Sequence, residues 1–350
     1  MITPVTHFLP LAKIRRQRFL PVAGTVLVRA GQDVKAEDVI AQADINPEHI
    51  SLEIERGLGV SKGDITGYMK RKIGDEIPEG SVVASRSGVV SRVVRAPRAG
   101  KLVAIGGGQV LLQVRNDPFE LKAGMPGSVI EVKVDFGAII QATGAWIQGV
   151  WGNGRLKTGL LLALAEEPNH VLTADQVDPG QRGTIILAGH CSEQNALEAL
   201  AEAHIGGLIL GSMSTRLLPF AARMHYPIIV IEGFGHIPMN AAAYTLLSTN
   251  AQREAAVNAV IYDRLSGDRP EIIIPLAGEN APIPINLEQL KIGHRVRVLR
   301  APHMGDIGTV NTIFPGLSLF PNGLRTEAAE IILEGEEKAL VPLANIEVIG

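Results

Sequence analysis

Two segments of this chain, residues 31–41 and 74–84, repeat nearly the same pattern, and they are called here the first copy and the second copy. A glycine is followed at the same spacing by an acidic residue, an aliphatic residue, a polar turn, two aliphatic residues and an alanine. Because the aliphatic positions are short and are separated by turn residues, the pattern is typical of short strands. The repeat therefore predicts a small β-rich domain that is built from two similar halves.

Length and composition indicate several globular domains. A chain of 350 residues exceeds what one ordinary hydrophobic core organises, so two or three domains are expected. The composition is 46% hydrophobic and 20% charged, which excludes a disordered chain. The 38 glycines and 21 prolines suit many short strands joined by turns.

Charge and cysteine content restrict the partners and the compartment. The formal net charge of −3 gives no general attraction to nucleic acid or anionic lipid, although residues 1–110 carry a modest positive excess. Cys191 is the only cysteine, so an internal disulfide is impossible and a reducing compartment is expected. The first 18 residues do not have the pattern of a signal peptide, and the apolar runs are too short to insert into a membrane. We expect a cytoplasmic protein.

The second copy and the residues after it carry the first resemblance. The run from Gly74 to Ser85, followed by the run from Ser87 to Ile105, resembles the barrel-sandwich hybrid fold of biotinyl and lipoyl carrier domains. The same fold occurs without a carried cofactor in proteins such as the electron-transport subunit RnfC. The resemblance spans roughly residues 19–115. It predicts a domain over residues 1–118, into which a helical segment is inserted at residues 47–72.

Carrier domains of this class present a modified lysine in a hairpin between their two halves, and this resemblance directs attention to two lysines. Lys35 follows Val34 inside a turn, and Lys70 follows Met69 within the predicted helix. Neither lies in the hairpin context that the carriers use. We therefore expect no biotin, no lipoyl group and no other cofactor.

The central part of the chain alternates strands with helices. Short apolar runs at residues 184–187, 206–210 and 227–231 predict strands, and residues 193–204, 215–225 and 238–247 have helical spacing or helix-start signals. Strands separated by helices predict a parallel sheet that is covered on both faces. With a β bridge before it and a late strand at residues 271–276, this α/β domain is assigned to residues 119–276.

Residues 277–286 contain two prolines and are predicted to be a linker to a domain at residues 287–350. In that domain the alternating run from Ile292 to Val298 is followed by a turn that begins Gly305-Asp306. This arrangement resembles the KOW motif of SH3-like barrels in transcription elongation and ribosomal proteins. The resemblance implies a small β-barrel that binds RNA or protein.

Three strand ends of the central domain carry the small polar residues from which a ligand site could be built. In an open parallel sheet, ligands bind at the carboxyl ends of the strands, where strand order reverses and helix N-termini favour anions. The alternative is that the hydroxyl residues are helix caps and that the glycines only form turns. The ligand-binding candidates are Gly189, His190, Cys191, Ser192, Ser212, Ser214, Thr215, Glu232, Gly233 and His236.

These residues allow two chemical alternatives. His190 beside Cys191 is compatible with a base and a nucleophile, but adjacent residues of a strand point apart and cysteine is commonly buried. His190, Cys191, Glu232 and His236 offer metal-ligand chemistry, but they lack the compact spacing of a zinc site. No catalytic residue and no metal ligand is therefore assigned.

The C-terminal domain supplies the nucleic-acid candidates, Arg295, Arg297 and Arg300. Arg295 and Arg297 alternate and would share one face of a strand, where they could contact phosphates. Against this, the domain is net negative and has few aromatic residues for stacking on bases. A solvated charged strand is the alternative.

These features favour a non-enzymatic scaffold or adaptor that binds protein partners through its β modules. The first alternative is a sensor of a small anion, or an enzyme, that uses the strand ends of the central domain. The second is a nucleic-acid-binding protein that uses the KOW-like barrel.

Overall fold

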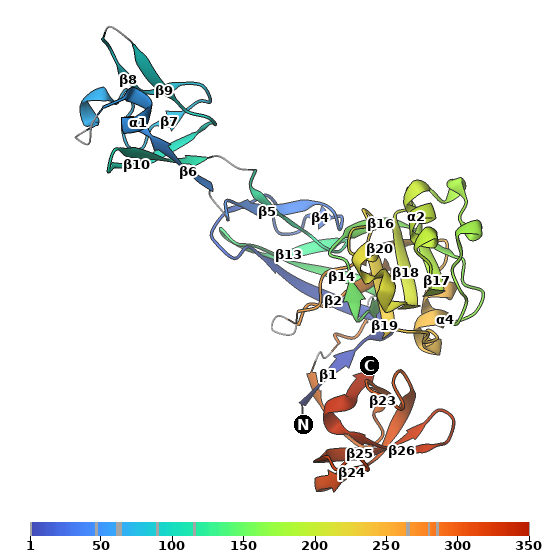
Figure 1. Cartoon of the computed structure of the whole chain (residues 1–350). Coiled ribbons are helices and arrows are strands. Elements are labelled where there is room, and N and C mark those ends of the chain that lie inside the picture. The colour runs from blue at the N-terminus through green and yellow to red at the C-terminus, as the bar shows by residue number, and fades with distance from the viewer. Residues whose placement is uncertain are drawn as a thin grey trace.

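The structure is a computed structural model that describes residues 2–45, 48–60, 65–88, 91–114, 117–263, 267–278, 281–284 and 287–349. Strands predominate and form several sheets, as the multidomain β-rich prediction required. Figure 1 shows a small module at one end of the molecule, a large sheet in the middle and the C-terminal sheet beyond it. Within the described residues no helix is both long and apolar enough to cross a membrane.

The module at the far end, called here the distal module, comprises residues 48–114. Its core is aliphatic and is centred on residues such as Ile54, Leu58 and Leu102. A four-stranded sheet in the order β6-β11-β10-β7 is accompanied by the hairpin β8–β9. Its elements are β6 (Glu48–Glu53), α1 (Ile54–Leu58), η1 (Thr66–Tyr68), β7 (Glu76–Ile77), β8 (Val82–Arg86), β9 (Arg92–Arg95), β10 (Gly100–Gly106) and β11 (Gln109–Val114).

The helical insertion predicted at residues 47–72 is largely wrong. Residues 48–53 form strand β6, and the only α-helix in the described part of this range has five residues. The reason is visible in the burial of Ile50, Leu52 and Ile54, which are at least partly buried and alternate with exposed residues in the two-residue period of a strand. Ser61, the predicted helix cap, lies outside the described residues.

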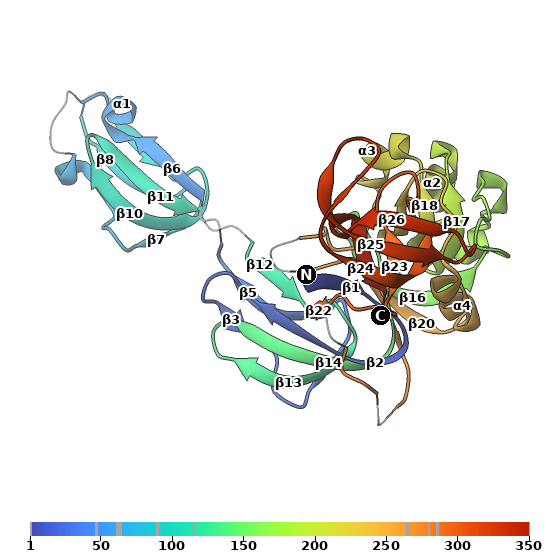
Figure 2. The same cartoon turned by 90° about the horizontal axis from the view of Figure 1, so that it is seen from below.

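The middle of the molecule is a second small β module that continues into a large sheet (Figure 2). Its core contains Ile14, Ile40, Met125, Ile140 and Trp146. The strands are β2 (Phe8–Phe19), β3 (Thr25–Val26), β4 (Asp33–Val34), β5 (Val39–Ala43), β12 (Phe119–Lys122), β13 (Gly127–Lys133) and β14 (Gly137–Gln148).

The two copies of the repeat lie in different modules, which corrects the expectation that they form two halves of one domain. In the first copy the amide of Gly31 donates to the carbonyl of Val129 at 2.8 Å, and in the second the amide of Gly74 donates to Leu102 at 2.8 Å. Both glycines have positive φ, of 81° and 98°, which explains why glycine recurs there. Each copy therefore has its own partner strand, and the distal module interrupts the chain between the first copy and its partner.

Three of the four central strands that follow coincide with the apolar runs predicted at residues 184–187, 206–210 and 227–231. Strands β16 (Leu156–Ala163), β17 (Ile185–Cys191), β18 (Gly207–Met213) and β19 (Ile228–Phe234) pair in parallel. Alternate residues of β17 face two cores: Ile185 and Leu187 pack with helix α4 (Ala241–Thr249), and Ile186 and Ala188 pack with helix α2 (Gln194–Glu202). Both faces of these strands are thus covered.

The rest of the central sheet is antiparallel. Strands β20 (Glu254–Asn258) and β21 (Glu271–Pro275) pair with each other, and β21 also pairs with β14, so one sheet continues from the parallel strands into the middle module. The late strand predicted at residues 271–276 coincides with β21. The remaining elements here are β15 (Trp151–Gly152), η2 (Ala174–Gln176), η3 (Pro179–Gln181), η4 (Thr215–Leu217) and α3 (Leu218–Ala221).

Two helices of the central strands differ from their predicted ranges in where they start or how far they continue. Instead of one helix over residues 215–225, the 3-10 turn η4 leads into the four-residue helix α3. The helix expected to begin at Pro238 begins at Ala241, because the Asn240 side chain accepts a hydrogen bond from the amide of Ala243 at 2.8 Å and caps it.

The C-terminal sheet contains seven strands and includes the first strand of the chain. Strand β1 pairs in parallel with β27 and antiparallel with β22, so residues 2–6, which were assigned to the 1–118 domain, belong to this sheet. The two chain ends accordingly lie close together (Figure 1). Its elements are β1 (Ile2–Thr6), β22 (Leu287–Gln289), β23 (Arg295–Val298), β24 (Ile307–Leu319), β25 (Arg325–Leu333), β26 (Lys338–Pro342), η5 (Leu343–Asn345) and β27 (Ile346–Ile349).

Candidate functional site

Three of the ten predicted strand-end residues meet, and they form a compact cluster. His190 at the end of β17 lies opposite Ser212 of β18, and its Nδ1 is 2.9 Å from the Ser212 Oγ. The amide of Ile237 also donates to this oxygen, at 3.1 Å. The His236 ring lies against that of His190, with 4.5 Å between the ring centroids. We call His190, Ser212 and His236 the strand-end cluster.

The electrostatics of this cluster favour a neutral, structural histidine. Burial, and then the proximity of His236, lower the pKa of His190. Ser212 is fully buried, and its oxygen is already engaged by two partners. A buried polar group at a strand end requires such partners, so these bonds account for both residues without a ligand.

Cys191 points away from this cluster. Its side chain belongs to the core that includes helix α2, whereas His190 contacts Ser212. Burial raises the pKa of the Cys191 thiol to about 11, so the thiolate form is scarce at neutral pH. The structure therefore does not form the base–nucleophile pair that was weighed for His190 and Cys191.

Local backbone structure explains why glycine occupies both of the candidate glycine positions. A Cβ at Gly189 would lie 2.3 Å from the carbonyl oxygen of His170, so this position has no space for a side chain. Gly233 has a φ of 137°, which side-chain-bearing residues rarely adopt.

The other three hydroxyl candidates, Ser192, Ser214 and Thr215, lie outside the cluster, and none of their side chains caps a helix. Helix α2 is preceded by Glu193, not by Ser192, and no side chain caps it. Ser214 precedes η4 without a side-chain capping bond, and Thr215 is the first residue of η4. The alternative that Ser192 and Thr215 cap helices is thus also wrong.

The order of the strands in the sheet does not favour a ligand crevice at their carboxyl ends. The four parallel strands lie in the sheet in the order in which they follow in the chain, β16-β17-β18-β19. A ligand crevice in such a sheet forms where successive connections diverge to opposite sides, and these four strands contain no such reversal.

Glu232, at the end of β19, joins the central strands to the C-terminal sheet. Its Oε1 accepts from the amide and the side chain of Asn240, at 3.0 and 2.5 Å, and its Oε2 pairs with Arg297 of β23 at 2.6 Å. The other arm of Arg297 pairs with Glu347 of β27 at 2.7 Å. Glu347 also pairs with Arg269 at 2.6 Å and accepts a hydrogen bond from Thr6. We call Glu232, Arg297, Glu347 and Arg269 the ionic joint.

The charges in the ionic joint depend on one another. Burial alone would raise the pKa of Glu347, but Arg297 and Arg269 outweigh it and hold this pKa at about 2. The Arg297 side chain is only 1% exposed, and burial, which lowers its pKa, is outweighed by the two carboxylates. Glu347 and Arg297 therefore stay charged inside the interface because each stabilises the charge of the other.

The three nucleic-acid candidates consequently lie in different environments. Arg297 is buried in the ionic joint and is inaccessible to a phosphate. Arg295 is exposed and pairs with Glu334 at 2.6 Å. Arg300 is exposed, and within the described part of the chain its side chain makes no hydrogen bond or ion pair. The prediction that Arg295 and Arg297 lie together on a solvated strand face is therefore wrong, because Arg297 is buried.

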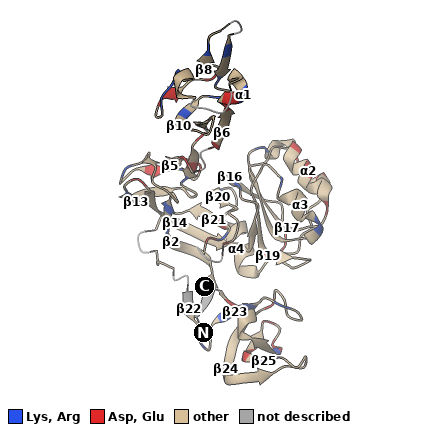
Figure 3. Ribbon diagram, turned by 60° about the vertical axis from the view of Figure 1, so that its left-hand side comes forward, with Lys and Arg blue, Asp and Glu red and all other residues tan. Residues whose placement is uncertain are grey.

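Cations near β8 and β9 of the distal module are also partly engaged (Figure 3). Arg86 donates to the carbonyl of Gly59 at 2.8 Å, Arg95 donates to that of Gly80 at 2.8 Å, and Arg98 pairs with Glu48 at 2.5 Å. These bonds give the arginines a role in holding the loops of the module.

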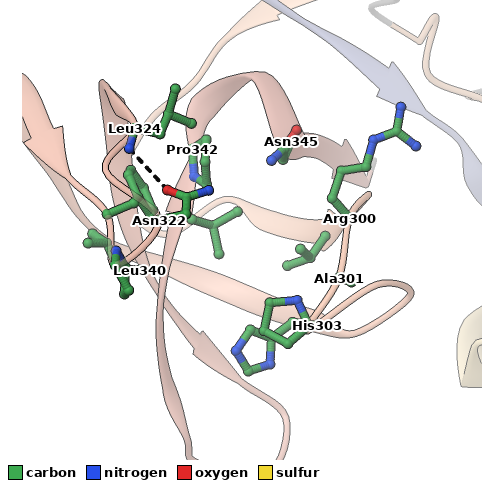
Figure 4. A pocket seen from close by; sticks show the side chains of 13 residues that line it. Arg300, Ala301, His303, Asn322, Leu324, Leu340, Pro342 and Asn345 are labelled. Atoms are coloured by element: carbon green, nitrogen blue, oxygen red, sulfur yellow. Dashed lines mark hydrogen bonds between the residues drawn. The ribbon is translucent and has the colours of Figure 1, made fainter.

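A pocket of about 280 Å³ lies at one end of the C-terminal sheet. Figure 4 shows Leu324 and Leu340 on one side of it, and Arg300 and Ala301 on the other. Phe320, Asn322, Pro342 and Asn345 also line it. Of these residues only Arg300 was singled out from the sequence. The Pro321-Asn322-Gly323 sequence is a turn signal from which a hairpin there could have been predicted, but the approach of β26 and of the loop after β23 has no local signal.

Apolar side chains project from the hairpin beside this pocket. Leu317 and Leu319 of β24 are 70% and 62% exposed, and Leu324 and Leu340 at the pocket are about half exposed. Leu317 lies opposite Glu327, and Leu319 opposite Arg325, in β25. We call residues 317–327 the apolar ribbon.

The chain matches no known family model, and no curated protein matches its sequence. In the part of the chain that the structure describes, no group of three or more histidine, cysteine or acidic residues is placed to hold a metal ion.

Proposed function

We propose that this protein is an adaptor that binds a partner protein through the apolar ribbon and the pocket of its C-terminal sheet. The observation that carries this proposal is the exposure of Leu317 and Leu319 beside a pocket with apolar walls. Contiguous exposed apolar residues with a polar rim are typical of surfaces that a partner covers. Glu327 and Arg325 across the hairpin supply such a rim.

The arrangement of the strands supports a finer interpretation of the fold. The antiparallel order β23-β24-β25-β26, with β27 returning to β23, supports an SH3-like barrel with a KOW-like start. The repeated pairing of Gly31 with Val129 and of Gly74 with Leu102 supports barrel-sandwich hybrids, one nested inside the other. The parallel strands β16–β19, with helices on both faces, support a central α/β domain. On this interpretation the central domain orients the β modules.

The two alternatives have less support. A sensor or an enzyme at the strand ends needs polar groups that are free to meet a ligand, whereas His190, Ser212 and Glu232 bond within the chain. Binding of nucleic acid through β23 needs Arg297 at the surface, whereas it is buried.

Site-specific photo-crosslinking tests the proposal. A photoreactive residue at position 319 is expected to give one discrete crosslinked protein in the source cells, and that protein, once purified, is expected to bind the purified chain. The matched control is Val134, an exposed apolar residue at the end of β13 that is 74% exposed. Equal crosslinking from positions 134 and 319, or no crosslink from 319, would contradict an adaptor role for this surface.

A further inference from the structure

The polar groups around the C-terminal pocket are mainly hydrogen-bond donors. The Arg300 guanidinium, at one margin, has no acceptor within the described residues. Asn322 uses its Oδ1 to accept from the amide of Leu324 at 3.1 Å, as Figure 4 shows, which leaves its NH2 group to donate. The Asn345 side chain likewise makes no hydrogen bond within the described part of the chain.

Among the described residues, no carboxylate lines the pocket. His303, on the pocket wall, lies 3.4 Å from Asp306, which is outside the lining. A surplus of donors, one of them cationic, favours an anionic oxygen over an amine or a metal ion. Arg300 in Figure 4 extends away from the centre of the pocket, but an exposed arginine changes rotamer in nanoseconds and can turn toward an anion.

The walls of the pocket add a second requirement. Phe320, Leu324, Leu340 and Pro342 are apolar, and the volume of about 280 Å³ suits one large side chain rather than a drug-sized ligand. A plain phosphate or acetate would leave these walls unused. The chemistry that fits both the donors and the walls is an aliphatic side chain with a carboxylate next to it.

The carboxyl-terminal residue of a polypeptide has this chemistry when it is leucine or a similar residue. Leu324 and Leu340 line the pocket and are also exposed, so residues that precede the terminus have an apolar surface to follow. We infer that this pocket binds the free carboxyl terminus of a partner chain that ends in a large aliphatic residue. This inference rests on the proposed adaptor function and names the part of the partner that is recognised.

Titration with a defined peptide tests it, with amide chemical shifts of the full-length protein as the signal. The probe is acetyl-Ala-Leu-Ala-Leu with a free carboxylate, and the same peptide with an amidated terminus is the control. We expect the amide to bind about tenfold more weakly or worse, because a charge-assisted hydrogen bond to Arg300 is lost. N-acetylleucine is a small molecule with the same side chain and free carboxylate, and it is expected to bind more weakly than the peptide.

Three variants locate the interaction. Arg300→Gln, on the surface, and Asn345→Asp, which places a negative charge in the pocket, are each expected to weaken binding about tenfold. Arg295→Gln removes an exposed arginine of the same sheet outside the pocket and is expected to leave the affinity unchanged. Equal binding of acid and amide, no shift at millimolar peptide, equal affinity for N-acetylleucine, or the same loss in Arg295→Gln as in Arg300→Gln would each overturn the inference.

The outcome can be separated from that of the adaptor proposal. If the peptide fails to bind but the crosslink from position 319 persists, the adaptor function stands and the carboxyl-terminal recognition is wrong. If both fail, the C-terminal surface is not a binding site.

Discussion

The strand-end cluster and the C-terminal pocket contain similar residue types but use them differently. At the strand ends, His190 and Ser212 are buried and bond to each other, and Glu232 is bound by Asn240 and Arg297. At the pocket, Arg300 and Asn345 make no side-chain bond within the described residues, and leucines beside them are exposed. Polar residues at the ends of buried strands must satisfy one another, so their presence alone does not indicate a ligand site.

The strongest test of this contrast is a pair of substitutions in one strand. Arg297→Met leaves Glu232 and Glu347 without their shared cation in a buried interface, so we expect a loss of about 3–5 kcal/mol in the free energy of unfolding. Arg295→Met, two residues away, breaks only an exposed ion pair and should cost about 1 kcal/mol or less. Denaturant unfolding measures both, and equal losses would show that the ionic joint does not hold the two sheets together.

Acid should weaken the ionic joint in a defined range. The pKa of Glu347 is about 2 in the folded protein and near 4.5 when unfolded, so its contribution is complete above pH 4.5 and is lost as the pH falls toward 2. Glu347→Gln should therefore lose less stability than the wild type between pH 5 and pH 2. The exposed Glu334→Gln in the same sheet is the control, because the loss of its exposed ion pair should change the free energy of unfolding by about 1 kcal/mol or less. A wild-type profile in Glu347→Gln would contradict this assignment.

A smaller effect is expected within the strand-end cluster. Ser212→Ala leaves the amide of Ile237 and the Nδ1 of His190 without their shared partner, which should cost about 1–3 kcal/mol of stability. Ser214→Ala, which breaks no side-chain cap, should be nearly neutral. Thermal unfolding distinguishes the two variants. Neither should change the crosslink from position 319, and a loss of that crosslink in Ser212→Ala at a temperature where it is folded would assign a binding role to the cluster.

The smallest effect on stability and the largest on binding should come from the apolar ribbon. Leu317→Ser is expected to change the free energy of unfolding by no more than about 0.5 kcal/mol, because the side chain is exposed. The crosslink from position 319 should nevertheless be lost. A variant that is clearly destabilised would show that Leu317 packs within the chain instead of facing a partner.

Local pattern predicted much of the fold, and long-range pairing accounts for what it missed. The apolar runs that became β17, β18 and β19 could be found because buried parallel strands are continuously apolar. The pairing of β1 with β27 joins opposite ends of the chain and has no local signal. The segments that pair with the two copies have the same length, because one runs from Ala96 to Leu102 and the other from Ala123 to Val129. This equal length is informative only when the pairing is already known.

For the site, the convergence of strand ends predicted the contacts of His190 with Ser212 and His236, but not what these residues do. His190, Ser212 and Glu232 were predicted to lie together because strand ends converge. Arg297 was predicted at the surface because it alternates with Arg295, but the central sheet packs on that face of β23 and buries it. Such packing between separate sheets depends on tertiary structure, so strand periodicity cannot predict it.

One measurement compares the two regions directly: the crosslinking yield from a photoreactive residue at His236, beside the strand-end cluster, against the yield from Leu319. Both positions are exposed, so both can report a partner. We predict a discrete protein crosslink from position 319 and none from position 236. A crosslink from position 236 alone would contradict the account and would indicate that the partner binds at the strand ends.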